Sequence, residues 1–329
     1  MTEYWIQFGI AVVGTFLLTA VLGRFIIRFL RDMKIKQHIL EIGPNWHKSK
    51  EGTPTMGGVC FILAILLCLA GFAIYYLIRG EQRSLIPLAL TLSLAVMNGL
   101  IGFVDDFCKL MKKQNQGLKA YQKALLQVLA AIAYIYLMQT FGDIDTRLHI
   151  PFTDIHVELG IVYYLFALLT IVGVVNSVNL TDGIDGLAST VTLVVFFFFS
   201  LVGITFFNLS LTLLSGAMVG GMLGFLVYNA HPAKVFMGDT GSLFLGGVVT
   251  GAAFIINEPV IIFLIGGVYI LESISVMLQV GSFKLRNKRI FKMAPIHHHF
   301  EKCGWGEGKI VTVFSVVTAL LCILCWFGL

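Results

Sequence analysis

Apolar residues run along this chain in ten long blocks, and short polar stretches separate them. The blocks lie approximately at 6–30, 57–78, 85–104, 121–141, 159–176, 187–207, 210–228, 243–257, 260–281 and 309–329. A helix needs about 20 apolar residues to cross the ~30 Å hydrocarbon core of a bilayer. The pattern therefore predicts an all-α polytopic integral membrane protein, with about ten transmembrane helices in a single domain over residues 1–329.

Two stretches depart from this pattern. The ninth block contains Glu272, Ser273 and Ser275 together with glycines, so we expect its helix to be broken. A charge within the bilayer is costly, and Glu272 is therefore expected to be functional or internally paired. Residues 148–159 alternate apolar and polar positions around a turn-like Thr153–Asp154 pair, which predicts a small external hairpin.

Composition and charge agree with a membrane protein. Hydrophobic residues make up 57% of the chain and charged residues 12%, with a mean hydropathy of +0.89, whereas soluble domains carry about 25% charged residues. Acidic Glu3 precedes the first basic residue, Arg24, the reverse of the order in a signal peptide. We therefore expect the first helix to be retained.

The distribution of basic residues predicts the orientation. Of the 23 Lys and Arg residues, all but Arg79, Arg83 and Arg147 fall at the loops that follow odd-numbered blocks. Cytoplasmic loops carry the excess of Lys and Arg in membrane proteins. The sequence thus predicts both termini outside and cytoplasmic loops at approximately 31–56, 105–120, 177–186, 229–242 and 282–308.

Five unusual polar stretches gather on this same predicted cytoplasmic side. They are KEGTPTMGG at 50–58, VDDFCK at 104–109, NSVNLTDGIDGL at 176–187, NAHPAKVFMGDTGS at 229–242 and FKMAPIHHHFEKCGWGE at 291–307. Structural polar residues would scatter over both faces. Their one-sided distribution indicates a single active site built from five loops near the headgroups.

The adjacent acids Asp105 and Asp106 end the third apolar block. They suit a general base or a magnesium site, because Mg²⁺ is usually held by one or two carboxylates and substrate phosphates. The alternative is a helix end neutralised by Lys109.

Asn179, Asp182 and Asp185 recur every three residues, a spacing that places side chains on one face of a helical turn. With Gly183 and Gly186 between them, they favour a site that hydrogen-bonds a polar ligand. The alternative is an Asp-Gly turn before a helix.

Asp239 lies between glycines just before the eighth block, following Phe236. Backbone N–H groups of such a loop can cradle phosphate, Asp239 could hold a metal, and Phe236 could stack on a base. The alternative is an ordinary helix start with Asp239 as its N-cap.

His297, His298 and His299 are consecutive, so they cannot all face one metal from a single helix, and zinc is disfavoured. A phosphate or sugar contact, or a proton shuttle near neutral pH, fits imidazoles better. Lys50 and the cluster Lys109–Lys123 offer positive charge to phosphates, although each also satisfies the positive-inside rule.

Taken in order, TPTMGG, VDD, NLTDGIDG, MGD and MAPIHHH resemble the motifs of the phospho-N-acetylmuramoyl-pentapeptide transferase branch of the polyprenyl-phosphate N-acetylhexosamine-1-phosphate transferase family. The resemblance covers essentially the whole chain. It implies UDP-N-acetylmuramoyl-pentapeptide as donor, undecaprenyl phosphate as acceptor, lipid I and UMP as products, and Mg²⁺ as cofactor. It also implies a homodimer in the bacterial inner membrane, with the site facing the cytoplasm and no nucleic-acid partner.

The resemblance also implies residue roles. Catalytic residues would be Asp105, Asp106, Asp239 and His297, with Asp239 and Asp105 as metal ligands. Substrate-binding residues would be Lys50, Thr55, Lys119, Lys123, Asn179, Asp182, Asp185, Asn229, Phe236, His298 and His299.

Two other functions fit parts of the pattern. A related polyprenyl-phosphate N-acetylglucosamine-1-phosphate transferase would share most motifs, and donor competition separates the two. An ion-coupled secondary transporter would place its acids near the bilayer midplane, where Glu272 alone lies.

Overall fold

The computed structural model describes residues 1–33, 52–112, 116–142 and 144–329. It is built almost entirely of helices, as expected in lipid, where every backbone polar group must be bonded within the protein. Ten of the helices are long and apolar enough to cross a membrane. The all-α polytopic fold predicted from the sequence is thus confirmed.

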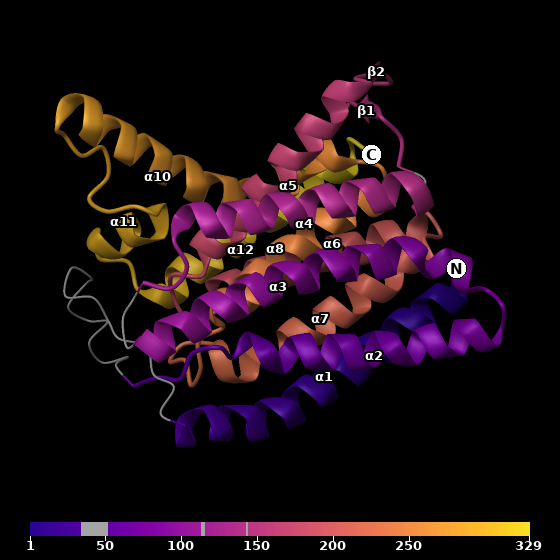
Figure 1. The fold of residues 1–329 in the computed structure, drawn as a ribbon, viewed down its shortest axis with the longest axis horizontal. Coiled ribbons are helices and arrows are strands. Elements are labelled where there is room, and N and C mark those ends of the chain that lie inside the picture. Colours follow the sequence, from indigo (N-terminus) through magenta and orange to yellow (C-terminus); the bar gives the residue numbers. More distant parts are fainter. Residues whose placement is uncertain (34–51, 113–115, 143) are drawn as a thin grey trace.

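The elements follow the chain in the order seen in Figure 1. The helices are α1 (Thr2–Asp32), α2 (Gly58–Ile78), η2 (Gln82–Leu85), α3 (Ile86–Lys112), α4 (Ala120–Phe141), α5 (Ile161–Thr181), α6 (Leu187–Thr205), α7 (Leu209–Asn229), α8 (Gly238–Ile255), η3 (Pro259–Ile261), α9 (Ile262–Ile265), α10 (Gly267–Arg286), α11 (Ile296–Lys302) and α12 (Glu307–Trp326). The strands are β1 (Arg147–His149) and β2 (His156–Glu158).

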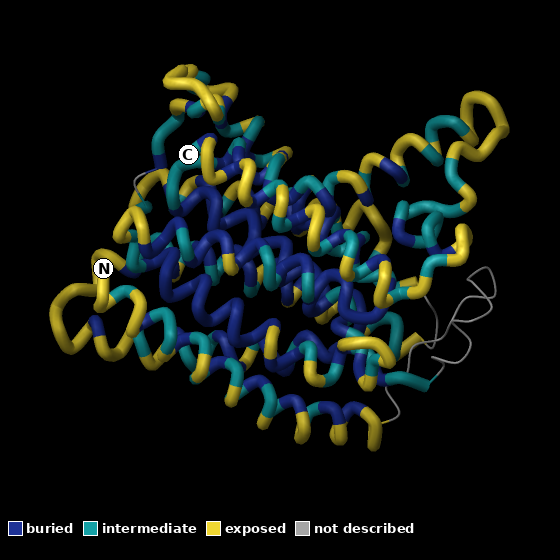
Figure 2. Tube along the Cα trace, turned by 180° about the vertical axis from the view of Figure 1, so that it is seen from behind, coloured by how far each residue is buried: buried dark blue, intermediate teal, exposed yellow. Residues whose placement is uncertain are grey.

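Helices α7 and α8 form the centre of the bundle. Their apolar segments are 83% and 89% buried, against 28% for α1, and the buried core runs through the middle of the molecule in Figure 2. Glycines allow this close packing. A Cβ on Gly220 would lie 2.2 Å from the carbonyl oxygen of Val12 in α1, and one on Gly246 would lie 2.6 Å from Cα of Val175 in α5.

The expected break of the ninth span is confirmed. The segment consists of η3 and the short α9, and at Gly266 the chain leaves α9 and begins α10. Helix α10 leans away from the bundle, with α11 beside it (Figure 1). Glu272 lies in the first turns of α10, is fully buried, and lies 3.1 Å from the imidazole of His297.

The expected hairpin is also present. β1 and β2 pair antiparallel, with Arg147 opposite Glu158 and His149 opposite His156. The hairpin and both chain termini lie at one end of the bundle, and α11 lies at the other (Figure 1). Ten spans place the two termini on one side, which agrees with the predicted topology, although the orientation in a membrane stays a prediction.

Several helices extend beyond the apolar blocks from which they were predicted. Helix α3 was expected to end near residue 104 but continues to Lys112, and α5 continues from 176 to Thr181. In α3 the added turns pair two acids with a lysine three and four residues later, an arrangement that stabilises helices. Hydropathy marks only the part of a helix that lies in hydrocarbon, so it misses these polar ends.

Candidate active site

The carboxylates of Asp105 and Asp106 lie in the last two turns of α3 and are both buried. Lys109, one turn later, places its Nζ 2.7 Å from Asp105 Oδ2 and 3.5 Å from Asp106 Oδ1. The backbone N–H of Leu118 donates to the other oxygen of Asp105 over 2.8 Å. The pair is therefore held in place by local partners, as the helix-end alternative required.

Asp106 makes contacts that neutralisation of a helix end by Lys109 would not require. Its Oδ2 accepts hydrogen bonds from the backbone N–H and the hydroxyl of Thr240, at 2.9 and 2.8 Å. This contact joins α3 to the first turn of α8. It depends on Gly102, where a Cβ would lie 2.1 Å from the carbonyl oxygen of Asp239, and on Gly238, whose φ of +73° is accessible to glycine.

Asp239 joins the two acids of α3 from the first turn of α8. Its Oδ2 lies 3.0 Å from Lys109 Nζ and 2.9 Å from Lys123 Nζ of α4. Its Oδ1 accepts from Asn179 Nδ2 of α5 over 3.0 Å, and Asn179 also donates to Ser242. Asp239 is not the N-cap of α8, since that position is Met237. Its side chain instead connects four membrane helices.

The three carboxylates form a candidate metal site. One oxygen each from Asp105, Asp106 and Asp239 lie within 4.8 Å of one another. Lys109 and Lys123 supply two formal positive charges against three formal negative ones, a formal sum of −1 when every group is ionised. An all-oxygen donor set with excess negative charge suits Mg²⁺, which prefers carboxylate and phosphate oxygens.

The segments TPTMGG and FMGDTGS lie side by side next to this cluster. Phe236 N–H donates to the Pro54 carbonyl over 2.9 Å, and the N–H groups of Gly57 and Gly58 donate to the carbonyls of Phe236 and Met237. Thr55 Oγ1 would be 3.0 Å from a Cβ on Gly238. Thr55 and the half-buried Phe236 therefore flank the start of α8, beside the acids.

Asn179, Asp182 and Asp185 do not share a helix face, which corrects the expectation from their spacing. Helix α5 ends at Thr181, Asp182 is its C-cap, and Asp185 lies in the link before α6. The Asp-Gly turn that was the alternative is the correct local reading. Asn179 reaches the acid cluster, whereas Asp185 points to a different set of partners.

Asp182 is set among negative groups. Burial, followed by the charges of Asp239, Asp106 and Asp185, raises the pKa of Asp182 well above its ordinary value. The environment therefore favours either a proton or a cation near this carboxyl.

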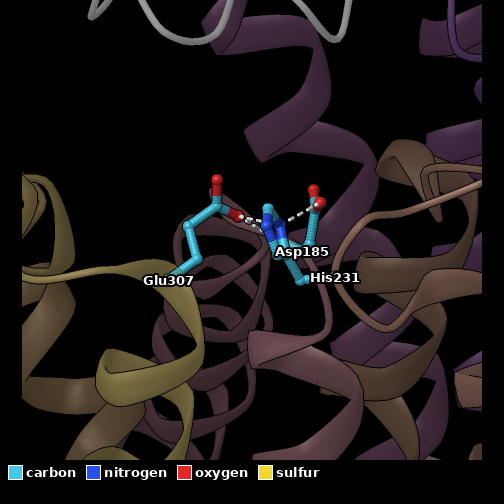
Figure 3. A group of neighbouring side chains, drawn as sticks. All are labelled: Asp185, His231 and Glu307. Atoms are coloured by element: carbon cyan, nitrogen blue, oxygen red, sulfur yellow. Dashed lines mark hydrogen bonds and ion pairs between the residues drawn. The ribbon is translucent and has the colours of Figure 1, made fainter.

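A second cluster contains Asp185, His231 and Glu307 (Figure 3). His231 Nδ1 lies 3.0 Å from Asp185 Oδ2 and 3.7 Å from Glu307 Oε2. Backbone bonds complete it: Ala233 N–H donates to Asp185, and Asp185 N–H donates to Glu307. The cluster ties the α5–α6 link, the α7–α8 loop and the start of α12 together.

Asn229 belongs to the same region. It accepts from Ser189 Oγ over 2.8 Å and donates to the Val235 carbonyl over 3.0 Å. It is buried, so these bonds fix the shape of the loop that leads to Phe236.

The three consecutive histidines point in different directions. His297 is fully buried against Glu272, and its Nε2 would be 2.1 Å from a Cβ on Gly183. His298 Nδ1 lies 2.6 Å from Glu301 Oε2, and His299 Nδ1 accepts from Lys292 N–H. The rings therefore do not converge on one ion. His297 links α10 and α11 to the turn that carries Asp182.

The lysines divide into groups. Lys123 reaches Asp239, but Lys119 is exposed and its N–H bonds to Gln122 at the start of α4. Lys50 lies outside the described residues. Lys109 was expected from the sequence to neutralise the acids or to offer charge to phosphates, whereas His231 and Glu307 were not proposed as site residues. The spacing of three and four residues after Asp106 and Asp105 marked Lys109, and the flanking Gly306 and Gly308 marked Glu307, whereas no local signal marked His231.

Comparison with known proteins gives matches over nearly the whole chain. A family model described as glycosyl transferase family 4 matches residues 88–257, and one described as phospho-N-acetylmuramoyl-pentapeptide-transferase signature 1 matches residues 50–62. Three similar proteins carry the name phospho-N-acetylmuramoyl-pentapeptide-transferase. The one from Clostridium botulinum strain Alaska E43 is 45% identical over 314 residues, covering 95% of this chain and 94% of its own length.

The second of these proteins, from Clostridioides difficile strain 630, is 45% identical over 309 residues, covering 93% of this chain and 92% of its own. The third, from Caldicellulosiruptor bescii, is 44% identical over 315 residues, covering 96% and 95%. These alignments extend over nearly the whole length of both proteins. The helices that build the acid cluster lie between residues 86 and 255, within or next to the segment that the family model matches.

Proposed function

Since this chain belongs to the phospho-N-acetylmuramoyl-pentapeptide-transferase family, we propose that it transfers phospho-N-acetylmuramoyl-pentapeptide from UDP-N-acetylmuramoyl-pentapeptide to undecaprenyl phosphate. The products are lipid I and UMP, and the reaction belongs to peptidoglycan biosynthesis. One observation carries the proposal: Asp105, Asp106 and Asp239 meet at the polar end of membrane helices, where a lipid phosphate and a nucleotide can both arrive.

The bond changes follow from these substrates. A phosphate oxygen of the lipid attacks the β-phosphorus of the donor, a new P–O bond forms there, and the bond to the bridging oxygen breaks. The electron pair leaves with UMP. A phosphate monoester is largely dianionic at neutral pH, because its second pKa is about 6, so the acceptor needs little activation. Phosphoryl transfer then depends mainly on positioning and charge neutralisation.

The protein groups divide these tasks. Asp105 and Asp239 are the proposed holders of Mg²⁺, which would neutralise phosphate charge when bound. Asp106 is fixed by Thr240 and orients the start of α8. Lys109 and Lys123 stand beside Asp239 and supply positive charge to the pyrophosphate.

The nucleotide end of the donor is assigned to the neighbouring loops. Phe236 is proposed to stack on uracil, with Asn179, Asp182 and Asp185 contacting the nucleoside. Lys50, Thr55, Asn229, His298 and His299 are retained as substrate-binding candidates. His297 is buried, so its proposed contribution is to hold the turn with Asp182 in place through Gly183. We assign the cytoplasmic face of the bacterial inner membrane and a homodimeric state as part of this proposal.

The test of the function is release of UMP. Purified protein in detergent should release UMP from UDP-N-acetylmuramoyl-pentapeptide only when undecaprenyl phosphate and Mg²⁺ are present, and chelation should stop it. UDP-N-acetylglucosamine serves as the competing donor. Turnover with that donor and none with the muramoyl-pentapeptide would overturn the assignment in favour of the N-acetylglucosamine branch.

Direct attack makes a separate prediction. Enzyme stripped of polyprenyl phosphate should not exchange labelled UMP into the donor, because direct attack forms no covalent enzyme intermediate and UMP leaves only when the acceptor attacks. A covalent aspartyl intermediate would give exchange without lipid. Exchange that persists in stripped enzyme and disappears in Asp105→Asn or Asp106→Asn would contradict direct attack while leaving the overall reaction unchanged.

A further inference from the structure

A basic cavity of about 360 Å³ opens between the end of α1 and the end of α7, apart from the acid cluster. Arg24, Arg28 and Arg31 of α1 and Lys234 of the α7–α8 loop line it. Specific ligand pockets are commonly about 300–1,000 Å³, so the cavity is of a size that holds a small polar group.

The wall of the cavity is built by close packing. Tyr228 packs closely against α1 at Gly23, where a Cβ would be only 2.6 Å from its ring. Its hydroxyl donates to the Ala20 carbonyl over 2.6 Å. Lys234 N–H donates to the Tyr228 carbonyl over 2.7 Å. The loop that carries Lys234 is thereby fixed beside α1.

The charge in the cavity is unbalanced. Four cationic side chains face one acid, Asp32. Within the described part of the chain, none of the four forms an ion pair with a carboxylate. Arg24, Arg28 and Arg31 are spaced at three and four residues, so they project from one face of the helix. Such a group of guanidiniums matches phosphate geometry.

The position of the cavity along α1 indicates its depth in the membrane, and the depth indicates which anion can reach it. Trp5 lies near the start of α1, and tryptophan is enriched at membrane interfaces. At 1.5 Å per residue, the ~30 Å hydrocarbon core ends about 20 residues later. That distance places Arg24 at headgroup depth. Beside the cavity, α1 exposes Val21, Phe25 and Phe29, which are 55%, 67% and 60% accessible, an apolar surface suited to acyl chains.

We propose that this cavity binds the phosphate headgroup of an anionic glycerophospholipid, with the acyl chains along the apolar face of α1. Basic pockets at the cytoplasmic ends of membrane helices bind such headgroups. The bound lipid joins α1 to the loop of Lys234, two residues before Phe236. It therefore stabilises the entry to α8 without contacting the reacting groups.

The experiment compares lipids on the delipidated full-length protein. Phosphatidylglycerol and phosphatidylcholine are added separately in neutral detergent, and retained lipid is counted by native mass spectrometry alongside the melting temperature. Phosphatidylglycerol should be retained and should raise the melting temperature more than phosphatidylcholine. Each of Arg24→Gln, Arg28→Gln and Lys234→Gln should weaken retention about fivefold, the factor for one basic residue near an anionic surface.

Matched controls lie at the other end of the bundle. Arg79→Gln and Arg83→Gln remove exposed arginines after α2 and in η2 and should leave retention unchanged. Without lipid, the cavity variants should melt like the wild type, which shows that they fold. Equal retention of both lipids, or equal losses in cavity and control variants, would overturn the proposal. So would displacement by inorganic phosphate at the concentration of the lipid, or retention of undecaprenyl phosphate alone.

Discussion

At the scale of single residues, Lys109 is, within the described part of the chain, the side chain that contacts all three clustered carboxylates. Its Nζ lies 2.7, 3.5 and 3.0 Å from oxygens of Asp105, Asp106 and Asp239. Like charges at this separation repel unless a cation or proton intervenes. Lys109 therefore stabilises the acids in the structure seen here, and a divalent cation entering the cluster competes with it for the same oxygens.

Asp239→Asn removes one formal charge at nearly constant volume. Lys123 and Lys109 lose a carboxylate partner, and the proposed metal loses a ligand, so we expect turnover to fall by about 100-fold or more, the range seen when one group that stabilises transferring charge is removed. Metal-dependent UMP release measures this. Asp154→Asn, exposed on the hairpin, is the control. Near-normal turnover and an unchanged magnesium requirement would show that Asp239 is not a ligand.

Asp182→Asn tests the raised pKa of Asp182, whose main cause is burial. When the pKa of a carboxyl group is higher in the folded state than its unfolded value of about 3.9, its contribution to folding stability is fully present at pH values below that unfolded pKa. The contribution is lost as the pH rises through the folded pKa. The variant should therefore melt above the wild type at alkaline pH, and the difference should shrink as the pH falls towards about 4. Melting temperatures without metal measure this, and a pH-independent difference would contradict it.

The residues of the acid cluster could be predicted because the sequence marks them locally. Asp105 and Asp106 interrupt an apolar run, and Asp239 stands between glycines. His231 carries no such mark, and Glu307, although it stands between Gly306 and Gly308, has nothing near it in the sequence that connects it with Asp185. Their contacts with Asp185 join positions 46 and 122 residues apart, and only the folded chain brings them together. For the same reason the regular spacing of Asn179, Asp182 and Asp185 was misleading, since helix α5 ends at Thr181, within that spacing.

At the scale of helices, the crossing of α3 and α8 sets the geometry of the site. Gly102 faces the backbone of Asp239, and Gly58 of α2 would place a Cβ 2.3 Å from Cα of Gly241. Neither neighbour is a flexible side chain that could move aside. The distance between the acids of α3 and Asp239 thus depends on residues that carry no charge.

Gly102→Ala should separate α3 from α8, because its Cβ would meet the Asp239 carbonyl oxygen at 2.1 Å. Overpacking of this kind costs typically about 1–3 kcal/mol, so we expect a lower melting temperature and reduced UMP release. Gly71→Ala in α2 is the matched control, since nothing lies within 4 Å of its added Cβ. If both variants melt and turn over alike, the crossing does not position the acids.

The number of helices could be read from hydropathy, but their ends could not. A membrane span requires a continuous apolar run of sequence, and every span shows one. In the ninth span the apolar run continues across Gly266, although the helix is interrupted there. Beyond the hydrocarbon, polar turns such as the one from Asp105 to Lys109 continue a helix through local ion pairs. The acids and the lysine of the candidate site lie in those turns. The helix ends that hydropathy misses are therefore the ones that form the site.

At the scale of the whole molecule, the orientation can be tested with a native probe. Cys303 is the exposed cysteine; Cys60, Cys322 and Cys325 are buried, and Cys68 and Cys108 are half-buried. A membrane-impermeant maleimide should label Cys303 in inside-out vesicles and not in intact spheroplasts. Cys303→Ser should abolish that labelling, and Asp154→Cys on the hairpin should show the reverse sidedness. Labelling of Cys303 in spheroplasts would overturn the predicted topology.

The central burial of α8 has a consequence for how the chain is made. Helix α8 has the lowest mean hydropathy of the ten spans, 1.2 against 2.2 for α1, and it is rich in glycine. The bilayer alone therefore retains it weakly, and contacts with α3 and α5 must hold it. During biosynthesis, α3 and α5 enter the membrane before α8, so Asp239 can reach its final depth only against partners already in place. A partly synthesised chain has two of the acids but no complete site, and it cannot consume its nucleotide donor before the bundle has assembled.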